Sequence, residues 1–161
     1  MKKFNQIAEF GKKIAMESDV HKVLELISQE AKSLVHADRC SLFIADEEAG
    51  LLWTKLSDGV ERIVVSDSSG IVGDTYKKKE PHIVNSPYDD ARFLPSIDKK
   101  TGYVTKNILT VPIFNSKRKV MGVLQLLNKH QADFDKEDLE LLTFFANYVS
   151  GTLELVLLSE E

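Results

Sequence analysis

The sequence is poor in the residues that build disulfide frameworks and metal centres. Cys40 is the only cysteine among 161 residues, which excludes an internal disulfide, a cysteine-rich zinc site and any mechanism that needs a second thiol. The four histidines show no metal-ligand spacing, so we expect no metal ion. Because Cys40 lies in an apolar run, we expect it to be a small buried residue of a cytoplasmic protein.

A basic surplus and a long apolar run are also missing. The chain carries 25 acidic and 21 basic side chains, a net charge of −4, so no general positive field attracts nucleic acid or an anionic membrane surface. No stretch approaches the roughly 20 apolar residues that cross a bilayer, and no apolar run follows Lys2 and Lys3. We therefore expect no nucleic-acid partner, no membrane anchor and no secretion signal.

What is present is enough for one hydrophobic core. With 43% hydrophobic residues, a chain of this length forms a single domain. Apolar residues at helical spacing predict a first helix through residues 4–14, and Ser18-Asp19 then caps a second helix from about Val20 to His36. We take residues 1–18 as an N-terminal linker helix and residues 19–161 as one domain that ends in a long helix.

The middle of the chain is rich in strand signals. Gly70 opens a short helix that runs toward Lys79. Residues 85–105 are polar and carry two prolines, which predicts a long loop of the kind that is usually functional or disordered. The predicted strands cover residues 40–44, 51–56, 63–65, 81–84, 108–114 and 120–127.

The last two strands form the plainest hairpin of the sequence, with a polar turn at residues 115–119. Pro112 indicates a bulge or an unpaired N–H side in the first of them. A final helix begins near Asp135, where Asp138 completes an imperfect capping box. The order of elements predicts an α+β fold, in which one antiparallel sheet of about six strands carries the terminal helices on one face.

One motif near the end of the hairpin is more specific. Residues 122–129 read Gly-Val-Leu-Gln-Leu-Leu-Asn-Lys. With the residues that follow, they resemble the signature of the GAF domains of cyclic-nucleotide phosphodiesterases and of some bacterial adenylyl cyclases: Asn-Lys, a spacer, Phe, three residues, then Asp-Glu. Leu139 replaces the Glu, and the matching positions are Asn128, Lys129, Phe134 and Asp138.

Two further stretches extend the resemblance. Residues 37–43 are similar to the family's first core strand, and residues 98–109 are similar to its Asp-x-x-Thr-Gly-Phe-x-Thr-Arg-Asn-Ile-Leu segment. The resemblance implies that Lys129 and Asp138 form an ion pair that supports the fold away from the ligand. It also implies a lid of loop and short helix over a pocket, on the sheet face opposite the terminal helices.

The resemblance implies a regulatory ligand-binding domain, and no nucleophile with a base is visible that would indicate an enzyme. It implies that the N–H groups of Ile71 and Val72 meet a cyclic phosphate and that Asp58 touches the purine. Ser57 and Leu94 depart from the family pattern, since an aromatic residue and a Tyr stand there in relatives. The implied ligand-binding residues are Ser41, Asp58, Ile71, Val72, Asp98, Thr101, Thr105 and Gln125.

The residues themselves leave several of these roles open. The Gly-Ile-Val-Gly stretch at residues 70–73 offers unhindered N–H groups at a helix start for an anion, or it makes only a tight turn with close packing. Asp58 and Asp98 fit acceptance from a purine as well as ordinary turn chemistry. Gln125 interrupts an apolar strand and points either into a pocket or to solvent.

Two functions fit these patterns. In the first, a purine cyclic nucleotide enters between sheet and lid, and the terminal helices pass the signal to an output domain. In the second, the domain has an unrelated ligand or none and dimerises its parent protein. A near-heptad seam on the terminal helices favours a homodimer, although the same residues can simply cover the sheet of one monomer. The seam consists of Phe4, Ile7, Ile14, Leu142, Phe145, Val149 and Val156.

Overall fold

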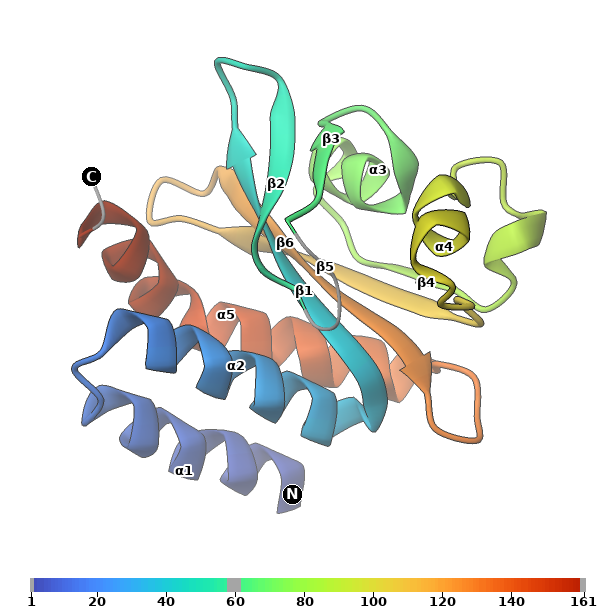
Figure 1. The fold of residues 1–161 in the computed structure, drawn as a ribbon. Coiled ribbons are helices and arrows are strands. Elements are labelled where there is room, and N and C mark those ends of the chain that lie inside the picture. The colour runs from blue at the N-terminus through green and yellow to red at the C-terminus, as the bar shows by residue number, and fades with distance from the viewer. Residues whose placement is uncertain (1, 58–61, 160–161) are drawn as a thin grey trace.

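An antiparallel sheet lies between a layer of long helices and a layer of short ones (Figure 1). The computed structural model describes residues 2–57 and 62–159. The strands are β1 (Ala37–Asp46), β2 (Leu51–Ser57), β3 (Val64–Ser66), β4 (His82–Val84), β5 (Ile108–Phe114) and β6 (Val120–Lys129). The helices are α1 (Lys2–Ala15), α2 (Val20–Val35), α3 (Gly70–Lys78), α4 (Ser96–Thr101) and α5 (Lys136–Ser159), with a short 3-10 turn, η1 (Pro87–Asp89).

The six strands form one sheet in the order β3-β2-β1-β6-β5-β4. All of the paired strands run antiparallel. In Figure 1, α1, α2 and α5 lie together on one side of the sheet, and α3 and α4 lie on the other. The predicted α+β fold with about six strands and terminal helices on one face is therefore confirmed.

Strand alternation divides the central strands between two cores. Leu42 of β1 and Leu124 of β6 belong to the core that is shared with α2 and α5. Phe43 and Val123, their neighbours in the chain, pack on the opposite face with Val72 of α3. Successive side chains of a strand point to opposite faces, so strands that are covered on both faces become continuous apolar runs.

The start of α5 is the capping box that the sequence indicates. The backbone N–H of Asp138 donates to Oδ1 of Asp135 at 2.8 Å, and the backbone N–H of Asp135 donates to Oδ2 of Asp138 at 3.0 Å. Each carboxylate thus satisfies an amide near the helix start, with Asp138 in the role usually taken by Glu.

The length and apolar composition of α5 differ from the expectation that no stretch of the chain is long and apolar enough to cross a bilayer. By length and composition alone, the helix from Lys136 to Leu158 is apolar enough to cross a bilayer, although no stretch of the sequence was expected to approach that length. Its Leu142, Phe145 and Val149 are fully buried, and the helix packs against β5 and α2. A helix that forms one wall of a core reaches the same mean hydropathy, because one face of it is almost entirely apolar.

The residues of the predicted dimer seam lie inside the monomer. Leu142, Phe145, Val149 and Val156 of α5 are buried in the core together with Ile7 and Ile14 of α1; Phe4 alone of the seam residues is exposed. A stripe at three- and four-residue spacing serves to cover a sheet as well as to pair two helices. Within one monomer these buried residues therefore cover the sheet, and a contact between protomers through the terminal helices stays a prediction.

Residues 85–105, which we call the lid, are also more regular than predicted. The long loop that the sequence indicated contains η1 and α4. α4 follows Pro95 and ends at Gly102, which has a φ of 78°. Proline at a helix start and glycine just past its end are a usual asymmetry of helices. Pro95 and Gly102, which also indicate a loop, therefore mark the two ends of α4.

Candidate functional site

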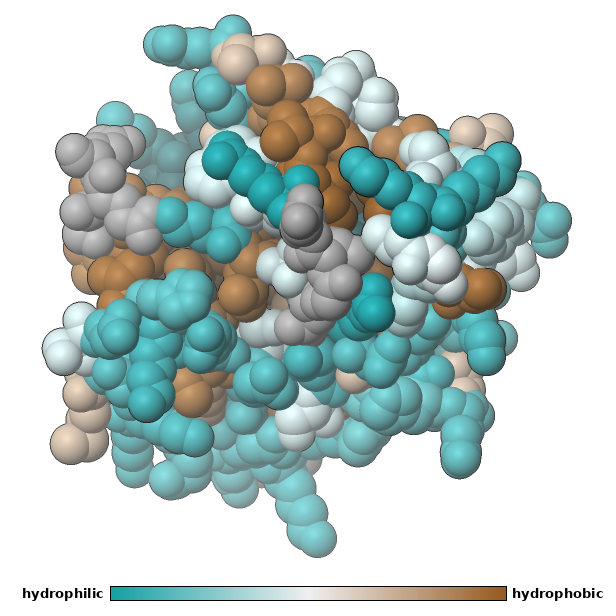
Figure 2. Space-filling view, in the orientation of Figure 1, coloured by the Kyte–Doolittle hydropathy of each residue, from teal (hydrophilic) through white to brown (hydrophobic). Residues whose placement is uncertain are grey.

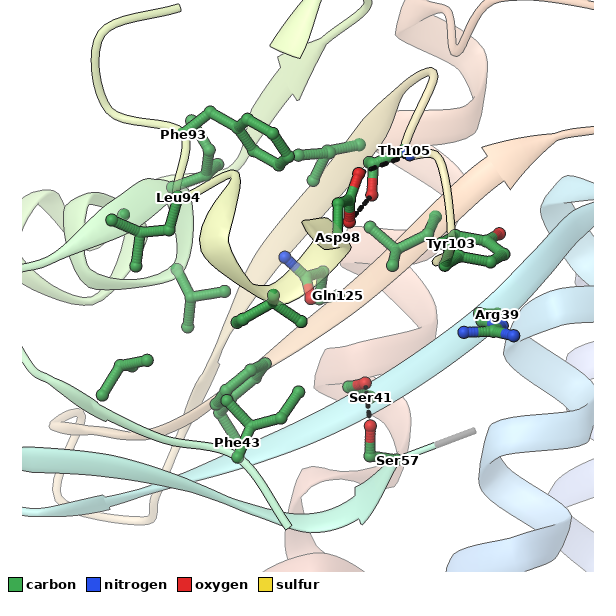
Figure 3. Close-up of a pocket in the computed structure, with 18 of the residues that line it drawn as sticks. Arg39, Ser41, Phe43, Ser57, Phe93, Leu94, Asp98, Tyr103, Thr105 and Gln125 are labelled. Carbon is green, nitrogen blue, oxygen red and sulfur yellow. Dashed lines mark hydrogen bonds between the residues drawn. The ribbon is translucent and has the colours of Figure 1, made fainter. Parts of the chain in front are cut away.

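A cavity lies between the sheet and the layer formed by α3 and the lid (Figure 3). The space inside it is about 750 Å³ when the open mouth is included. The sheet contributes its floor, α3 one wall and the lid its cover. The predicted residues that line it are Ser41, Ile71, Val72, Asp98, Thr101, Thr105 and Gln125; Asp58 lies outside the described residues.

The floor is built by the same face of β1 and β6. Ser41 and Gln125 are paired across these two strands, and both side chains line the cavity with Phe43. The hydroxyl groups of Ser41 and Ser57 are 2.9 Å apart. Of the two orientations open to Gln125, the structure has the one that faces the cavity (Figure 3).

The start of α3 forms one wall. Ser69 precedes the helix without a side-chain cap, and in the described part of the chain no acceptor bonds the N–H groups of residues 70–72. Gly70 has a φ of 73°, and a Cβ built on it would lie 3.1 Å from Leu94. A Cβ on Gly73 would lie 3.0 Å from the backbone of Ser68. The glycines therefore allow close packing, and they also leave free donors at the positive end of the helix.

Asp98 of the lid makes its hydrogen bonds within the protein. Its Oδ2 accepts from Tyr88 Oη at 2.6 Å and from the Thr105 backbone N–H at 2.7 Å, while its Oδ1 accepts from Thr105 Oγ1 at 2.8 Å. Asp98 and Thr105 thus line the cavity but bond each other, and Thr101 Oγ1 donates to the carbonyl of Ile97. In this conformation the three side chains shape the lid.

A second cluster attaches the lid to α3. Arg92 donates to both carboxylate oxygens of Asp90, at 3.0 and 2.7 Å, and to Asp74 Oδ2 at 2.6 Å. These hydrogen bonds from Arg92 lower the pKa of Asp90 to about 2. His82 Nε2 lies 3.1 Å from the same Asp74 oxygen without a hydrogen-bonding orientation, and burial lowers the pKa of His82.

Arg39 and Tyr103 are among the cavity residues that the sequence did not predict. The guanidinium of Arg39 lies over the ring of Tyr103, with Cζ 3.7 Å from the ring centroid. Tyr103 Oη donates to Asp38 at 2.7 Å, and burial together with this bond raises the pKa of Tyr103 well above its usual value. Arg39 precedes Ser41 by two positions on one strand, so alternation was a usable signal for it. The contact with Tyr103 is long-range and left no local pattern.

The signature residues lie at the end of β6, outside the cavity lining. Asn128, which has a φ of 59°, accepts from the backbone N–H of Lys106 at 2.6 Å and donates to the carbonyl of Val104 at 2.9 Å. Lys129 and Asp138 form an ion pair, as expected, and Phe134 is buried. These residues join β6, the segment after the lid and the start of α5.

The chain matches the model of the GAF domain family over residues 19–153. This protein belongs to the GAF domain family. Over 149 residues it is 32% identical to the probable 3',5'-cyclic phosphodiesterase pde-5 of Caenorhabditis elegans, a match that covers 84% of this chain and 20% of that protein. It is also 32% identical, over 158 residues, to the cGMP-specific 3',5'-cyclic phosphodiesterase of Drosophila mojavensis, a match that covers 87% of this chain and 14% of that one.

Solved structures agree with the fold of this GAF domain. The GAF domain from Acinetobacter phosphoenolpyruvate-protein phosphotransferase superposes with a TM-score of 0.83 at 21% identity, over 99% of this chain and 98% of that one. At this identity the similarity concerns the fold. The chain spans a fifth or less of the length of the two phosphodiesterases, and the part that it matches is the GAF domain.

Proposed function

We propose that this GAF domain is a regulatory sensor of a small molecule and that its ligand is a purine cyclic nucleotide. The observation that carries the proposal is the cavity itself, which combines free N–H donors at the start of α3 with a polar floor at Ser41 and Gln125. The similarity to phosphodiesterases, one of which is named as cGMP-specific, supports the choice of ligand class.

In this proposal the cyclic phosphate lies at the start of α3. The N–H groups of residues 70–72 donate to it, and the helix dipole favours its negative charge. Apolar residues of the cavity, such as Phe43 and Leu94, contact the ring faces of the ligand. The base then lies over the floor, where the amide of Gln125 both donates and accepts.

The lid supplies the regulatory part of the proposal. Asp98, Thr101 and Thr105 contribute to it from α4 and the segment after it, so a ligand beneath the lid favours the closed arrangement over an open one. The ligand can shift this equilibrium only by its difference in affinity for the two states. The sheet separates the lid from α5 and α1 (Figure 1), and we propose that these terminal helices pass the change to an output domain of a longer cytoplasmic protein.

Calorimetry with cGMP, cAMP, guanosine and adenosine tests this function. We expect one of the cyclic nucleotides to bind. We expect its nucleoside to bind about tenfold or more weakly, because the hydrogen bonds to a charged phosphate are lost. Absence of heat and of any thermal shift with both nucleotides at millimolar concentration would refute the nucleotide proposal. Equal binding of nucleoside and nucleotide would refute the position of the phosphate.

An interaction module is the second candidate, and exposed apolar side chains favour it. Phe4 of α1 meets Phe144 of α5 edge to face, with ring centroids 4.9 Å apart, and both are nearly half exposed. Leu155 and Leu158, near the C-terminal end of α5, are more exposed still. Figure 2 shows apolar surface over the C-terminal end of α5. A homodimer through this surface is compatible with a ligand in the cavity, since the two lie on opposite faces of the sheet.

A further inference from the structure

Arg39 is a charged residue of the cavity that the proposed function has not used. It lies on β1, two residues before Ser41, and its side chain lines the same cavity. The plane of its guanidinium covers the ring of Tyr103, and the hydroxyl of Tyr103 is in turn held by Asp38. The position of the guanidinium is therefore fixed from one face.

The other charged group among the described lining residues is Asp98, and it has three donors of its own. Within residues 2–57 and 62–159, no carboxylate forms an ion pair with Arg39, and no acceptor takes a hydrogen bond from it. A partly buried cation with unfilled donors beside an apolar cavity is costly unless a partner completes it. We therefore expect a ligand of this cavity to place acceptor atoms beside the guanidinium of Arg39.

The contact of the Arg39 guanidinium with the ring of Tyr103 determines which N–H groups of Arg39 can bind a ligand. A guanidinium that lies over an aromatic ring keeps its N–H groups free in its own plane, and all of them are donors. In Figure 3, Arg39 lies at the Tyr103 end of the cavity, and Leu94 lies at the far end. Leu94 packs over Gly70, the first residue of α3. A ligand with its phosphate on α3 thus extends its base toward Arg39.

We propose that Arg39 reads the edge of the base and makes the cavity select guanine over adenine. This inference rests on the proposed function. The O6 and N7 atoms of guanine are both acceptors and match a guanidinium fork, whereas adenine places an amino donor beside N7. The amide of Gln125 has a donor and an acceptor and suits either base, so of these two described residues Arg39 is the one that distinguishes the bases.

The experiment is calorimetry of cGMP and cAMP on the native chain and on Arg39→Gln. We expect the native chain to prefer cGMP by about 10- to 100-fold, as a bidentate contact to guanine does elsewhere. Arg39→Gln should weaken cGMP by a similar factor and should not weaken cAMP, because a glutamine amide can pair with N6 and N7 of adenine. Arg39→Lys should fall between, because it keeps the charge and loses the fork.

Arg62→Gln is the matched control. Arg62 also lies over an aromatic ring, that of Trp53, with Cζ 4.5 Å from the centroid, but it does not line the cavity. Its substitution should change neither affinity. Circular dichroism and thermal unfolding of each variant show whether the fold is intact, and the ratio of the two affinities is a readout that a general loss of stability does not move.

The outcomes separate the two proposals. If cyclic nucleotides bind but the native chain shows no preference for cGMP, or if the preference survives in a folded Arg39→Gln, the role of Arg39 is wrong and the sensor function stands. If neither nucleotide binds the native chain, the proposed function fails and the role of Arg39 fails with it.

Discussion

Gly70 determines the geometry of the α3 end of the cavity. Its φ of 73° lies in the left-handed region, where a residue with a Cβ is strained. Leu94 of the lid packs directly over it. The same residue thus turns the chain into α3, leaves the first N–H groups of the helix uncovered, and provides the surface on which the lid rests.

We predict that Gly70→Ala destabilises the protein by about 1–2 kcal/mol, from the unfavourable φ and the contact with Leu94. Gly151→Ala in α5 is the control, since a Cβ there meets nothing within 4 Å and the position is helical. It should stabilise by about 0.5–1 kcal/mol. Urea unfolding measures both; an unchanged or raised stability for Gly70→Ala would contradict the role of the glycine.

The sequence predicted which residues line the cavity better than it predicted their hydrogen-bond partners. The family resemblance implied that Ser41 and Gln125 line a pocket, whereas strand alternation left Gln125 facing either the pocket or solvent; in the structure both side chains line the floor. The bonds of Asp98 were not predictable, because Tyr88 and Thr105 reach it through the fold of the lid. A carboxylate in a loop has the same local sequence signal whether its partner is a ligand or a neighbouring residue.

At the scale of the elements, the lid is held closed by charge. Arg92 bridges Asp90 of the lid and Asp74 of α3. This arrangement gives the lid an attachment that depends on ionised carboxylates. The contact lies between two short elements, and such segments open at a smaller free-energy cost than the central strands do.

We predict that Asp90→Asn destabilises the protein at neutral pH by about 1 kcal/mol or less, because the pair is partly exposed. The pKa of Asp90 is lowered from 3.8 to about 2 in the folded protein. Its contribution is therefore present above pH 4 and lost as the pH falls toward 2. The difference from the native chain should vanish near pH 2. Thermal unfolding against pH measures it, and Asp89→Asn, at the exposed neighbour, is the matched control variant.

Element boundaries were predicted well where one local signal decided them and poorly where two signals competed. The β5–β6 hairpin and the start of α5 follow from a polar turn and from the Asp135–Asp138 capping box. Pro112 pairs with Val123 beyond the last β4 partner at Thr110, and the register of β5 with β6 shifts between Ile113 and Phe114. In the lid, by contrast, the short α4 was hidden because its proline and glycine also indicate a loop.

The ion pair of Lys129 and Asp138 gives a third prediction. The side chains are 14% and 7% exposed, so Lys129→Met leaves a buried carboxylate without its cation and should cost about 3 kcal/mol. Asp138→Asn in the same background should recover part of this loss. Lys136→Met, which removes a pair that is largely exposed, should cost less than 1 kcal/mol. Denaturant unfolding of the native chain, Lys129→Met, Asp138→Asn and the double variant gives the coupling energy of the pair. This energy decides whether the pair couples the end of β6 to α5.

At the scale of the whole molecule, the sheet divides two kinds of apolar surface. The cavity lies on the side of α3 and the lid, and α1 and α5 lie on the other side of the sheet (Figure 1). α1 is part of this second layer, because Phe10 and Ile14 are buried in the same core as α5. In the proposed sensor, a signal from the lid to an output domain would therefore cross the sheet and leave through helices whose inner faces are already occupied.

The same division moves the proposed dimer contact to other residues. The buried faces of α1 and α5 are used within the monomer, so a second copy has only their outer faces to contact. We expect that Leu155→Lys with Leu158→Lys converts a dimer to a monomer in sedimentation equilibrium. Because both side chains are more than half exposed, the unfolding midpoint should match that of the native chain when both are measured at a concentration where the native chain is a monomer.

Val149→Ala provides the opposite control for that experiment. Val149 is fully buried, and its truncation should destabilise each monomer by about 1–3 kcal/mol through a cavity while the folded protein keeps its association constant. If the lysine pair leaves association unchanged and Val149→Ala weakens it in the folded state, then α5 pairs through its buried stripe and α1 must leave the core on dimerisation. If the native chain is a monomer at high concentration, the interaction function fails and the cavity alone carries the role of the domain.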